Sequence, residues 1–447
     1  MFQVNKFDNN FTIFLVWLYS FYNIYLYREV IYIKRVIFIL VVFLQLLSLS
    51  IFTFAEDETP YGSVWASMYE FQENIEIYSP DVNKYLTNFY SQYPEMEFYF
   101  GGYKGNSLNN HNSLTFTYIN KEVKYEDIHT AKNNEEIYDI ILRAILYCDE
   151  GVNIVLYEEA DLEGIINDIL KKQPLASMGY SGFSSSGFHS GLTNHYIYHI
   201  DLKYTIENKL LLEYKLATED LARDIVCNNV ARSMPDYLKE KVIHDYICNN
   251  SEYSYDNGEL AYLPYNLLKN GKGVCSAYTL SMQIMLNMCG IESLYVSGRG
   301  NEENHSWNIV NIYGEYYHLD TTWDDPVNQY GIDETVYTYF NVTDEVMSKN
   351  HKWDRGKYPQ CNSTTYNSDN VNKQYDFFKN NNKYTDYYNK EELPSIYTRY
   401  KPLNANVVVP SPEDYAMSNE IYFDKDFYYF TVYVLCILIY VIKRTKK

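Results

Sequence analysis

The pattern of apolar and polar residues is most informative between residues 275 and 320. From 275 to 288, apolar side chains recur at helical spacing in two neighbouring stripes. A helix that is apolar over most of its circumference is buried, and Gly290 supplies a natural C-terminal stop. The pattern therefore predicts a buried helix that begins at Cys275. Its stripes are formed by Tyr278, Met282, Met285 and Cys289, and by Ala277, Leu280, Ile284 and Met288.

In the next segment, apolar and polar residues alternate as in the two strands of a β-hairpin. Residues 305–312 form one predicted strand, Tyr313 and Gly314 form the turn, and residues 315–320 form the returning strand. A two-residue loop places Trp307 opposite Asp320, so that His305 lies on the same face and diagonal to Asp320. A three-residue loop would instead place Asp320 opposite Asn308, on the wrong face. The pairing of His305 with Asp320 therefore requires a two-residue turn.

Residues 60–215 predict a smaller α+β domain with an internal repeat. Two short helices, at 81–93 and 160–172, are each followed by a proline, a Gly/Ser-rich turn and an alternating strand. We expect this domain to serve as a spacer or binding module. The prolines are Pro94 and Pro174, the turns span 101–112 and 179–191, and the strands span 113–118 and 195–204.

Residues 216–360 predict a second domain, which begins with two helical pieces between 219 and 249. Thr218 is the expected N-cap of the first piece, and Pro235 marks the start of the second. Beyond Cys361, Asn, Tyr, Ser, Lys and Asp dominate and aliphatic residues are scarce until Leu393. This composition predicts a poorly packed, low-complexity stalk over residues 361–426.

Apolar runs near both ends of the chain predict contact with a membrane. Residues 36–55 follow Lys34 and Arg35 and have the layout of a signal peptide or an uncleaved signal anchor. Residues 427–442 are uncharged and precede a basic cluster, which predicts a C-terminal transmembrane anchor. Upstream, residues 1–35 form an apolar extension, in which 11–27 either spans the membrane or belongs to an over-extended start. We therefore expect a membrane-anchored protein whose ectodomain faces outward at a bacterial cell surface.

Charge and cysteine content narrow the classes of function. The net charge is −21, and no basic stripe is present in the body of the chain, which excludes nucleic acid as the expected partner. Seven cysteines are too few and too scattered to form a disulfide framework. One of them, Cys275, lies in the distinctive segment Gly-Lys-Gly-Val-Cys-Ser-Ala-Tyr at 271–278.

Cys275, His305 and Asp320 together predict a nucleophilic centre. A thiol becomes a useful nucleophile as a thiolate, which needs a nearby base and a group that orients this base. Cys275 opens a helix, where unpaired backbone N–H groups favour a thiolate and can stabilise an oxyanion. His305 is the expected base, and Asp320 is expected to fix its tautomer and support the imidazolium. Each residue alone has an ordinary structural explanation, but their joint occurrence favours a catalytic triad.

These segments resemble the transglutaminase-like superfamily, specifically its bacterial extracytoplasmic branch. The resemblance covers about a quarter of the chain and implies an α+β, papain-like core in which a Cys-bearing helix packs on an antiparallel sheet. It also implies Cys275 as nucleophile, His305 as base and Asp320 as orienting residue. Members include transglutaminases, peptidases, peptide N-glycanases and inactive relatives, so the fold leaves the reaction open. The similar segments are 240–247, 267–278, 305–308, 319–324, 339–347 and 351–353.

The leading hypothesis is a thiol enzyme that acts on protein or cell-wall peptide amides through a thioester, by hydrolysis or by acyl transfer to an amine. The alternative is a non-catalytic cell-wall or adhesion module that retains the fold. Animal crosslinking transglutaminases carry Gln before and Trp after the cysteine, whereas this chain has Val274 and Ser276. This difference leaves specific glutamine chemistry open.

Other polar residues have lesser predicted roles. Tyr262 and Tyr265 are candidates for a second oxyanion donor, and His318 is interpreted as a packing residue. His189, His195 and His199 lack a Cys or acidic ligand that would complete a metal shell, so we expect no metal and no cofactor. The sequence does not specify an oligomeric state.

Overall fold

The computed structural model describes residues 61–108, 110–326, 335–380 and 384–403. The described residues from Ser67 onward belong to one compact unit. The predicted extension 1–35, signal segment 36–55 and anchor 427–442 lie outside the described residues. Within the described ranges, no helix combines the length and apolarity that a membrane crossing requires.

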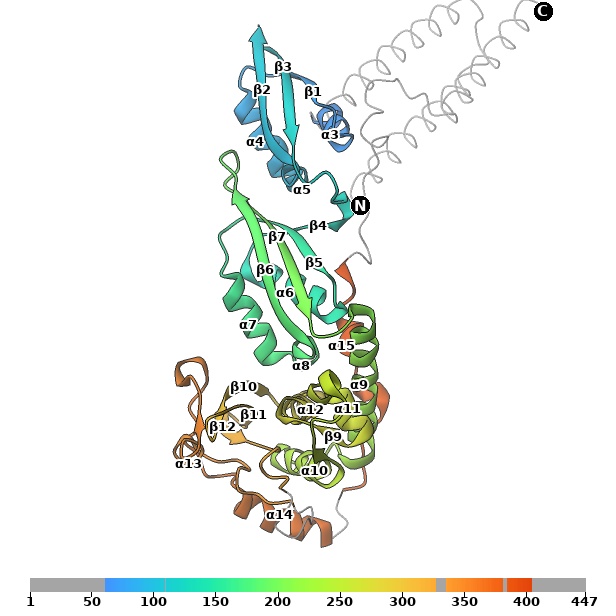
Figure 1. The fold of residues 1–447 in the computed structure, drawn as a ribbon, viewed down its shortest axis with the longest axis vertical. Helices are drawn as coiled ribbons and strands as arrows, with labels where there is room; N and C mark the ends of the chain where they lie inside the picture. The colour runs from blue at the N-terminus through green and yellow to red at the C-terminus, as the bar shows by residue number, and fades with distance from the viewer. Residues whose placement is uncertain (1–60, 109, 327–334, 381–383, 404–447) are drawn as a thin grey trace, which may run out of the picture. The chain divides into compact units, whose positions relative to one another are not determined.

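The first part of the fold is a three-stranded antiparallel sheet with short helices (Figure 1). The strand order is β1-β3-β2. Asp81 caps the helix that follows β1, because its carboxylate accepts a hydrogen bond from the backbone N–H of Lys84. The elements are α3 (Gly62–Tyr69), β1 (Asn74–Tyr78), α4 (Val82–Gln92), α5 (Pro94–Glu97), β2 (Phe100–Leu108) and β3 (His111–Tyr118).

The second part is a four-stranded mixed sheet in the order β4-β5-β7-β6, in which β4 and β5 are parallel. Asp161 caps α7 as Asp81 caps α4, by accepting a hydrogen bond from the backbone N–H of Gly164. The elements are η1 (Tyr125–Asp127), β4 (Ile128–Ala131), α6 (Asn134–Tyr147), β5 (Gly151–Leu156), α7 (Leu162–Lys172), α8 (Pro174–Ser177), β6 (Tyr180–His189) and β7 (Tyr196–Tyr204).

The helices and strands predicted for these parts are confirmed, but the predicted Gly/Ser-rich turns at 101–112 and 179–191 are wrong. These residues instead form most of β2 and β6. Each strand starts with a bulge at a glycine of positive φ, Gly102 or Gly182. Further along, a Cβ on Gly105 would collide with the partner strand, so this glycine is required by close packing within the sheet. The two parts share the order helix, proline helix, bulged strand and strand; a true sequence repeat stays a prediction.

The third part carries the buried helix and hairpin predicted from the sequence. Its antiparallel sheet has the order β12-β11-β10-β13, and helix α12 packs against β10 and β11 (Figure 1). The elements are α9 (Asn208–Asn229), α10 (Asp236–Asn250), β8 (Glu252–Tyr253), η2 (Gly258–Tyr262), α11 (Pro264–Asn270), β9 (Lys272–Gly273), α12 (Cys275–Met288), β10 (Ser293–Gly300), β11 (Glu303–Ile312), β12 (Glu315–Leu319), α13 (Asp344–Met347), β13 (His351–Lys352) and η3 (Arg355–Lys357). An α+β fold with a cysteine-bearing helix on an antiparallel sheet is thus confirmed.

Helix α9 corrects the prediction that Thr218 caps a helix. The helix begins at Asn208 and is capped by Glu207, whose carboxylate accepts from two backbone N–H groups. Thr218 lies in the helix interior, where its hydroxyl donates to the carbonyl of Tyr214 one turn earlier. The boundary predicted between residues 215 and 216 therefore falls inside a continuous helix.

Helix α12 is buried along most of its length, as its apolar girth predicts. Its core positions join one hydrophobic cluster that also includes residues of α6, α7, α9 and α10. Burial of apolar surface contributes about 25 cal/mol per Å² to the free energy of folding, so the packing of this helix in the core stabilises its position. Gly290, at φ +78°, terminates it.

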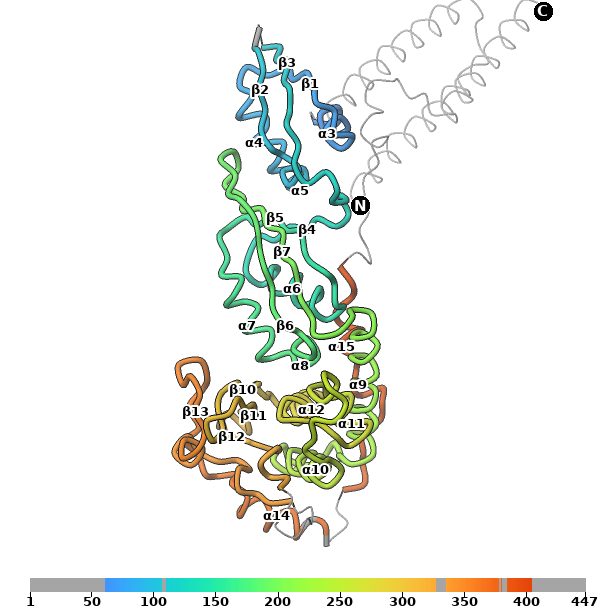
Figure 2. Tube along the Cα trace, in the orientation of Figure 1, coloured from blue at the N-terminus to red at the C-terminus, as the bar shows by residue number. Residues whose placement is uncertain are grey.

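The hairpin has the predicted two-residue loop, and the Cα trace of Figure 2 follows it from β11 into β12. Ile312 pairs with Glu315, and Asn308 pairs with Leu319. Tyr313 and Gly314 have φ values of +55° and +89°, the left-handed conformation that a tight hairpin turn requires. Continuing this register places Trp307 opposite Asp320, which keeps His305 and Asp320 on one face.

The predicted stalk is wrong over its described part, because residues 361–380 and 384–403 contain α14 (Ser368–Asn380), η4 (Lys390–Glu392) and α15 (Ile396–Arg399). Leu393 is buried, and its carbonyl accepts a hydrogen bond from Arg223 at 3.0 Å. Glu219 accepts a hydrogen bond from the backbone N–H of Ile396 at 2.7 Å. Widely spaced apolar residues and tyrosines fix this segment onto the body, although its composition is polar. Residues 404–426 lie outside the description.

We expect Leu393→Ala to lower the free energy of unfolding by about 2–5 kcal/mol, because it removes a buried leucine from the main core. Chemical denaturation of the full chain measures this change. Leu216→Ala is the matched control, since Leu216 is exposed on α9 and its loss should change stability by less than about 0.5 kcal/mol. Equal, small effects of both substitutions would contradict the packing of this segment.

We expect Gly314→Ala to destabilise the hairpin by about 1–2 kcal/mol, because a Cβ is unfavourable at φ +89°. Thermal or denaturant unfolding checks this value. Gly191→Ala is the control, since Gly191 has no neighbour within 4 Å of an added Cβ and no positive φ. If the two variants were equally stable, the left-handed turn would not determine the register.

Candidate active site

Cys275 lies at the first position of α12 and is partly exposed. The residues before it are held in place, because β9 pairs with β8 and the backbone N–H of Val274 donates to the carbonyl of Ala261 at 2.9 Å. Val274 is extended, so the chain turns abruptly into the helix at the cysteine. The backbone N–H groups at the very start of the helix therefore lie next to the thiol.

Polar contacts fix α12 against the strand that carries His305. The hydroxyl of Thr279 contacts the hydroxyl of Ser306 at 3.1 Å and donates to the carbonyl of Cys275 at 2.8 Å. The amide of Asn308 donates to the carbonyl of Thr279 at 3.2 Å. These bonds link the start of α12 to β11, so Cys275 and His305 are brought together by two rigid elements.

His305 and Asp320 form a close pair, as the hairpin register predicts. Nε2 of His305 lies 2.7 Å from Oδ2 of Asp320, and the Asp320 side chain is fully buried. The other oxygen of this carboxylate, Oδ1, accepts the backbone N–H groups of Thr322 at 3.1 Å and Trp323 at 3.2 Å. Because Asp320 occupies Nε2, the remaining nitrogen Nδ1 of His305 is the one available to Cys275.

The charges in this group favour a thiolate. Burial alone would raise the pKa of Cys275, but hydrogen bonds from His305 and Ser306 and the charge of His305 outweigh it and lower this pKa below its usual value. Burial opposes protonation of His305, yet its contacts with Asp320 and Cys275 raise its pKa to about 9. For Asp320, burial is outweighed by two histidines, so its pKa is lowered. The arrangement can hold a thiolate beside an imidazolium.

The structure adds His351, which the sequence did not single out. It lies on the short strand β13, opposite Gly300 of β10, and its Nε2 is 3.1 Å from the same Oδ2 of Asp320. His351 occurs in a segment of family resemblance, but no spacing in the sequence marks it as a neighbour of Asp320. Only the pairing of β13 with β10 brings it there.

His318 has more than the packing role predicted for it. Nδ1 of His318 accepts a hydrogen bond from the indole N–H of Trp307 at 2.9 Å, and Nε2 lies 2.9 Å from Asp344. An indole nitrogen can only donate, so the proton of His318 must reside on Nε2. Burial lowers the pKa of His318 despite the nearby Asp344, so the ring is a neutral link between the hairpin and α13.

Among the described residues, two groups of side chains place donor atoms within 4.8 Å of one another, as a metal site requires: His305, Asp320 and His351, and His318, Asp344 and Cys361. In the second group, the indole donor on Nδ1 forces the proton onto Nε2, which blocks that nitrogen as a ligand. In the first group, the 2.7 Å contact is shorter than the roughly 3.3 Å between two ligands of tetrahedral zinc. Hydrogen bonds, rather than coordination, account for both groups.

The two tyrosines predicted as oxyanion donors lie in different surroundings. Tyr262 lies beside the residue that follows Cys275, since its backbone carbonyl accepts a hydrogen bond from the hydroxyl of Ser276 at 3.0 Å. Its ring is 47% exposed. Tyr265 instead stacks on Tyr214, with ring centroids 4.5 Å apart. The sequence did not suggest Tyr295. Burial is the main cause that raises the pKa of Tyr295 to about 12, and the charge of the nearby Cys275 adds to it.

Of the three histidines considered for a metal, His189 ends β6, His195 directly precedes β7 and His199 lies in β7, and each has another partner. His195 pairs with the buried Glu97 at 2.8 Å. His199 contacts Asn153 at 2.6 Å and Asp201 at 3.1 Å. The ring of His189 lies 4.5 Å from that of Tyr196. Each therefore has a local hydrogen-bonding or stacking role.

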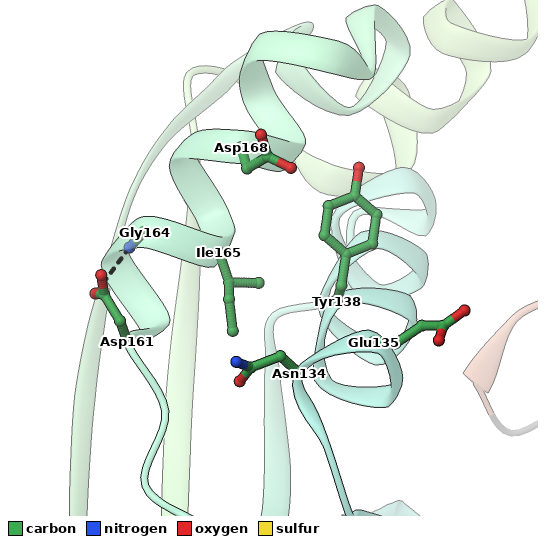
Figure 3. Close-up of a pocket in the computed structure, with 7 residues that line it drawn as sticks. All are labelled: Asn134, Glu135, Tyr138, Asp161, Gly164, Ile165 and Asp168. Atoms are coloured by element: carbon green, nitrogen blue, oxygen red, sulfur yellow. Dashed lines mark hydrogen bonds between the residues drawn. The ribbon is translucent and has the colours of Figure 1, made fainter. Parts of the chain in front are cut away.

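A separate hollow of about 400 Å³ lies between α6 and α7 (Figure 3). It is lined by Asn134, Glu135, Tyr138, Asp161, Gly164, Ile165 and Asp168. Asp161 is used as the cap of α7, and Asp168 pairs with Lys172 at 2.9 Å. This hollow contains no thiol or imidazole and is distinct from the group around Cys275.

Comparison with known proteins supports the resemblance noted in the sequence. Residues 221–321 match the family model of the transglutaminase-like superfamily. This segment contains Cys275, His305 and Asp320 but excludes His351. A comparison with curated protein sequences finds no match.

Solved structures similar to this chain include three with low scores. One is a "TGase", at 16% identity and a TM-score of 0.24 over 48% of this chain and 63% of that one. The second is a "Putative Cysteine Protease from Cytophaga hutchinsonii", at 16% identity and a TM-score of 0.20 over 32% of this chain and 62% of that one. The third is a "putative protease" from Parabacteroides distasonis, at 11% identity and a TM-score of 0.20 over 38% and 39%. This chain thus spans less than two thirds of the length of each.

We expect Cys275 to react with iodoacetamide at pH 7 at least about 10-fold faster than Cys289, because the pKa of Cys275 is lowered while burial raises that of Cys289 to about 12. His305→Ala should slow the labelling of Cys275 about 10-fold, since it removes the group that stabilises the thiolate. Mass spectrometry of the two cysteine-containing peptides measures both rates. Unchanged labelling of Cys275 in the His305→Ala variant would contradict this electrostatic assignment.

Proposed function

Because residues 221–321 form a transglutaminase-like core, we propose that this protein is a thiol enzyme that attacks an amide and forms a thioester on Cys275. His305 acts as the base and acid, and Asp320 orients it. The observation that carries this proposal is the arrangement of a partly exposed thiol at a helix start, a histidine on the adjacent strand and a buried carboxylate 2.7 Å from that histidine.

The reaction follows from the protonation states of these groups. The Cys275 thiolate attacks the carbonyl carbon of the amide, and the developing oxyanion is stabilised by backbone N–H groups at the start of α12. His305 then donates its proton to the leaving amine as the C–N bond breaks, which leaves a thioester. In the second half, neutral His305 removes a proton from water or an amine, which attacks the thioester; the C–S bond breaks, the acyl product leaves, and the thiolate and the imidazolium are restored.

The proposed substrates are protein or cell-wall peptide amides. The apolar runs 36–55 and 427–442 support a location at the cell surface, where such amides are accessible. Val274 and Ser276, which differ from the neighbours of the cysteine in animal crosslinking enzymes, favour a substrate other than the glutamine those enzymes use. The choice between water and an amine depends on the surface around Cys275.

The test is to incubate the full chain with a glutamine-rich protein and a labelled primary amine. Incorporation of label indicates acyl transfer, whereas cleavage or deamidation without label indicates hydrolysis; either result supports a thioester enzyme. We expect Cys275→Ala to reduce the activity at least about 10³-fold, because the nucleophile is lost. Mass spectrometry measures the products.

Cys289→Ala is the matched control, because Cys289 lies just beyond the other end of α12 and is buried. This variant should retain the activity. Activity that survives in Cys275→Ala would overturn the proposal. An inactive wild type whose Cys275 reacts no faster than a free cysteine would instead support the alternative, a non-catalytic cell-wall or adhesion module with the same fold.

A further inference from the structure

Asp320 has two histidine partners on one oxygen atom. Oδ2 lies 2.7 Å from Nε2 of His305 and 3.1 Å from Nε2 of His351. A carboxylate can only accept, so both Nε2 atoms carry a proton and donate to the same oxygen. In a simple triad, this oxygen would serve the catalytic histidine alone.

The ring of His351 is held in a fixed orientation. Its Nδ1 donates a hydrogen bond to the side-chain oxygen of Asn350 at 2.8 Å, and the amide nitrogen of Asn350 donates to the hydroxyl of Tyr339 at 2.6 Å. Because both ring nitrogens of His351 donate, the ring is held as an imidazolium. The ring centroid of His351 is 4.3 Å from that of Trp323 and 5.0 Å from that of Trp307. His351 is 1% exposed, so no solvent competes for its hydrogen bond to Asp320.

Two donors on one oxygen share its negative charge. When His351 donates to Oδ2, the attraction of this oxygen for the proton on His305 is weaker than it would be with His305 alone. The imidazolium form of His305 is then stabilised less. A histidine that remains too basic would hold its proton instead of accepting one from water or an amine in the second half of the reaction.

We propose that His351 is a positioning residue, which holds the Asp320 carboxylate and moderates the basicity of His305 in a relay of His351, Asp320, His305 and Cys275. This inference rests on the proposed function, because it assigns a role in the same thiol chemistry. His351 touches neither the thiol nor any reacting atom, and it acts only through Asp320.

Other ionisable groups surround this relay and stay constant in the test. His318 and Asp324 are close enough for electrostatic coupling with His351 and Asp320, respectively. The ring of Tyr339 lies 5.3 Å from His351, and Tyr253 and Tyr295 couple to Cys275. Substitution of His351 alone leaves all five in place, so a shift between variants reports on His351.

The test compares alkylation of Cys275 by iodoacetate and by iodoacetamide in the full chain between pH 5 and 11. An imidazolium beside the thiolate attracts the anionic reagent, so the ratio of the two rates falls as His305 loses its proton. For the wild type, the fall should be centred at about pH 9. Mass spectrometry of the Cys275 peptide separates this reaction from that of the other cysteines.

We expect His351→Phe, which keeps a ring for stacking, to move this midpoint up by about one pH unit. The sign follows because Oδ2 then serves only His305, which becomes more basic. His351→Gln, whose amide N–H can replace Nε2–H but carries no charge, should move the midpoint up by less than His351→Phe does. A His351→Phe midpoint equal to that of the wild type would overturn the inference, as would a His351→Gln midpoint equal to that of His351→Phe.

Asn350→Leu provides a second test if His351→Phe does not fold. This substitution removes the partner of Nδ1 and loosens the ring, so the midpoint should again move up; an unchanged midpoint overturns the inference. Failure of the proposed function gives a different result, because Cys275 of the wild type would then show no enhanced reactivity and no dependence of the rate ratio on pH.

Discussion

The structure around the thiol depends on one buried carboxylate, that of Asp320. Removing a carboxylate from water is unfavourable unless donors replace the solvent. Here the donors are the backbone N–H groups of Thr322 and Trp323 and the rings of His305 and His351. They come from the turn after β12, from β11 and from β13. Each of these elements must therefore be in register for Asp320 to be stable as an anion.

This requirement links distant parts of the sequence to the chemistry of Cys275. The left-handed turn at Tyr313 and Gly314 sets which face of the hairpin carries Asp320, and hence whether His305 can reach it. The hydrogen bonds of Thr279 and Asn308 then fix the position of α12 along β11. A slip of one residue in either strand would turn a charge-stabilised group into a buried, unpaired carboxylate. The strand register that brings His305 to Asp320 is thus also the register that keeps this buried carboxylate paired.

The sequence predicted the parts of this arrangement that depend on local periodicity. Short-range patterns predict that α12 is apolar on most of its surface, that the hairpin strands alternate and that the loop has two residues. These features bring Cys275, His305 and Asp320 into one region. His351 could not be found in this way, because it approaches Asp320 through the pairing of a two-residue strand with β10. Likewise, composition suggested a stalk after Cys361, whereas Leu393 and Tyr397 are buried by contacts with α9 and α6, far away in the sequence. The glycines of β2 and β6 led to a wrong prediction of turns for the same reason, because close packing against a neighbouring strand, and not a turn, explains glycine there.

Burial also limits where specificity can arise. His305, Asp320 and His351 are all buried, whereas Cys275 is partly exposed, so a substrate reaches the group only from the side of the thiol. The start of α12 is bordered there by β8 and η2, which carry the exposed rings of Tyr253 and Tyr262. These rings can cover an extended chain without ionic contacts, as aromatic side chains do at many binding surfaces. Under the proposed function, no group of the relay behind the thiol distinguishes water from an amine. The fate of the thioester then depends on how completely a bound substrate and these tyrosines exclude water from Cys275.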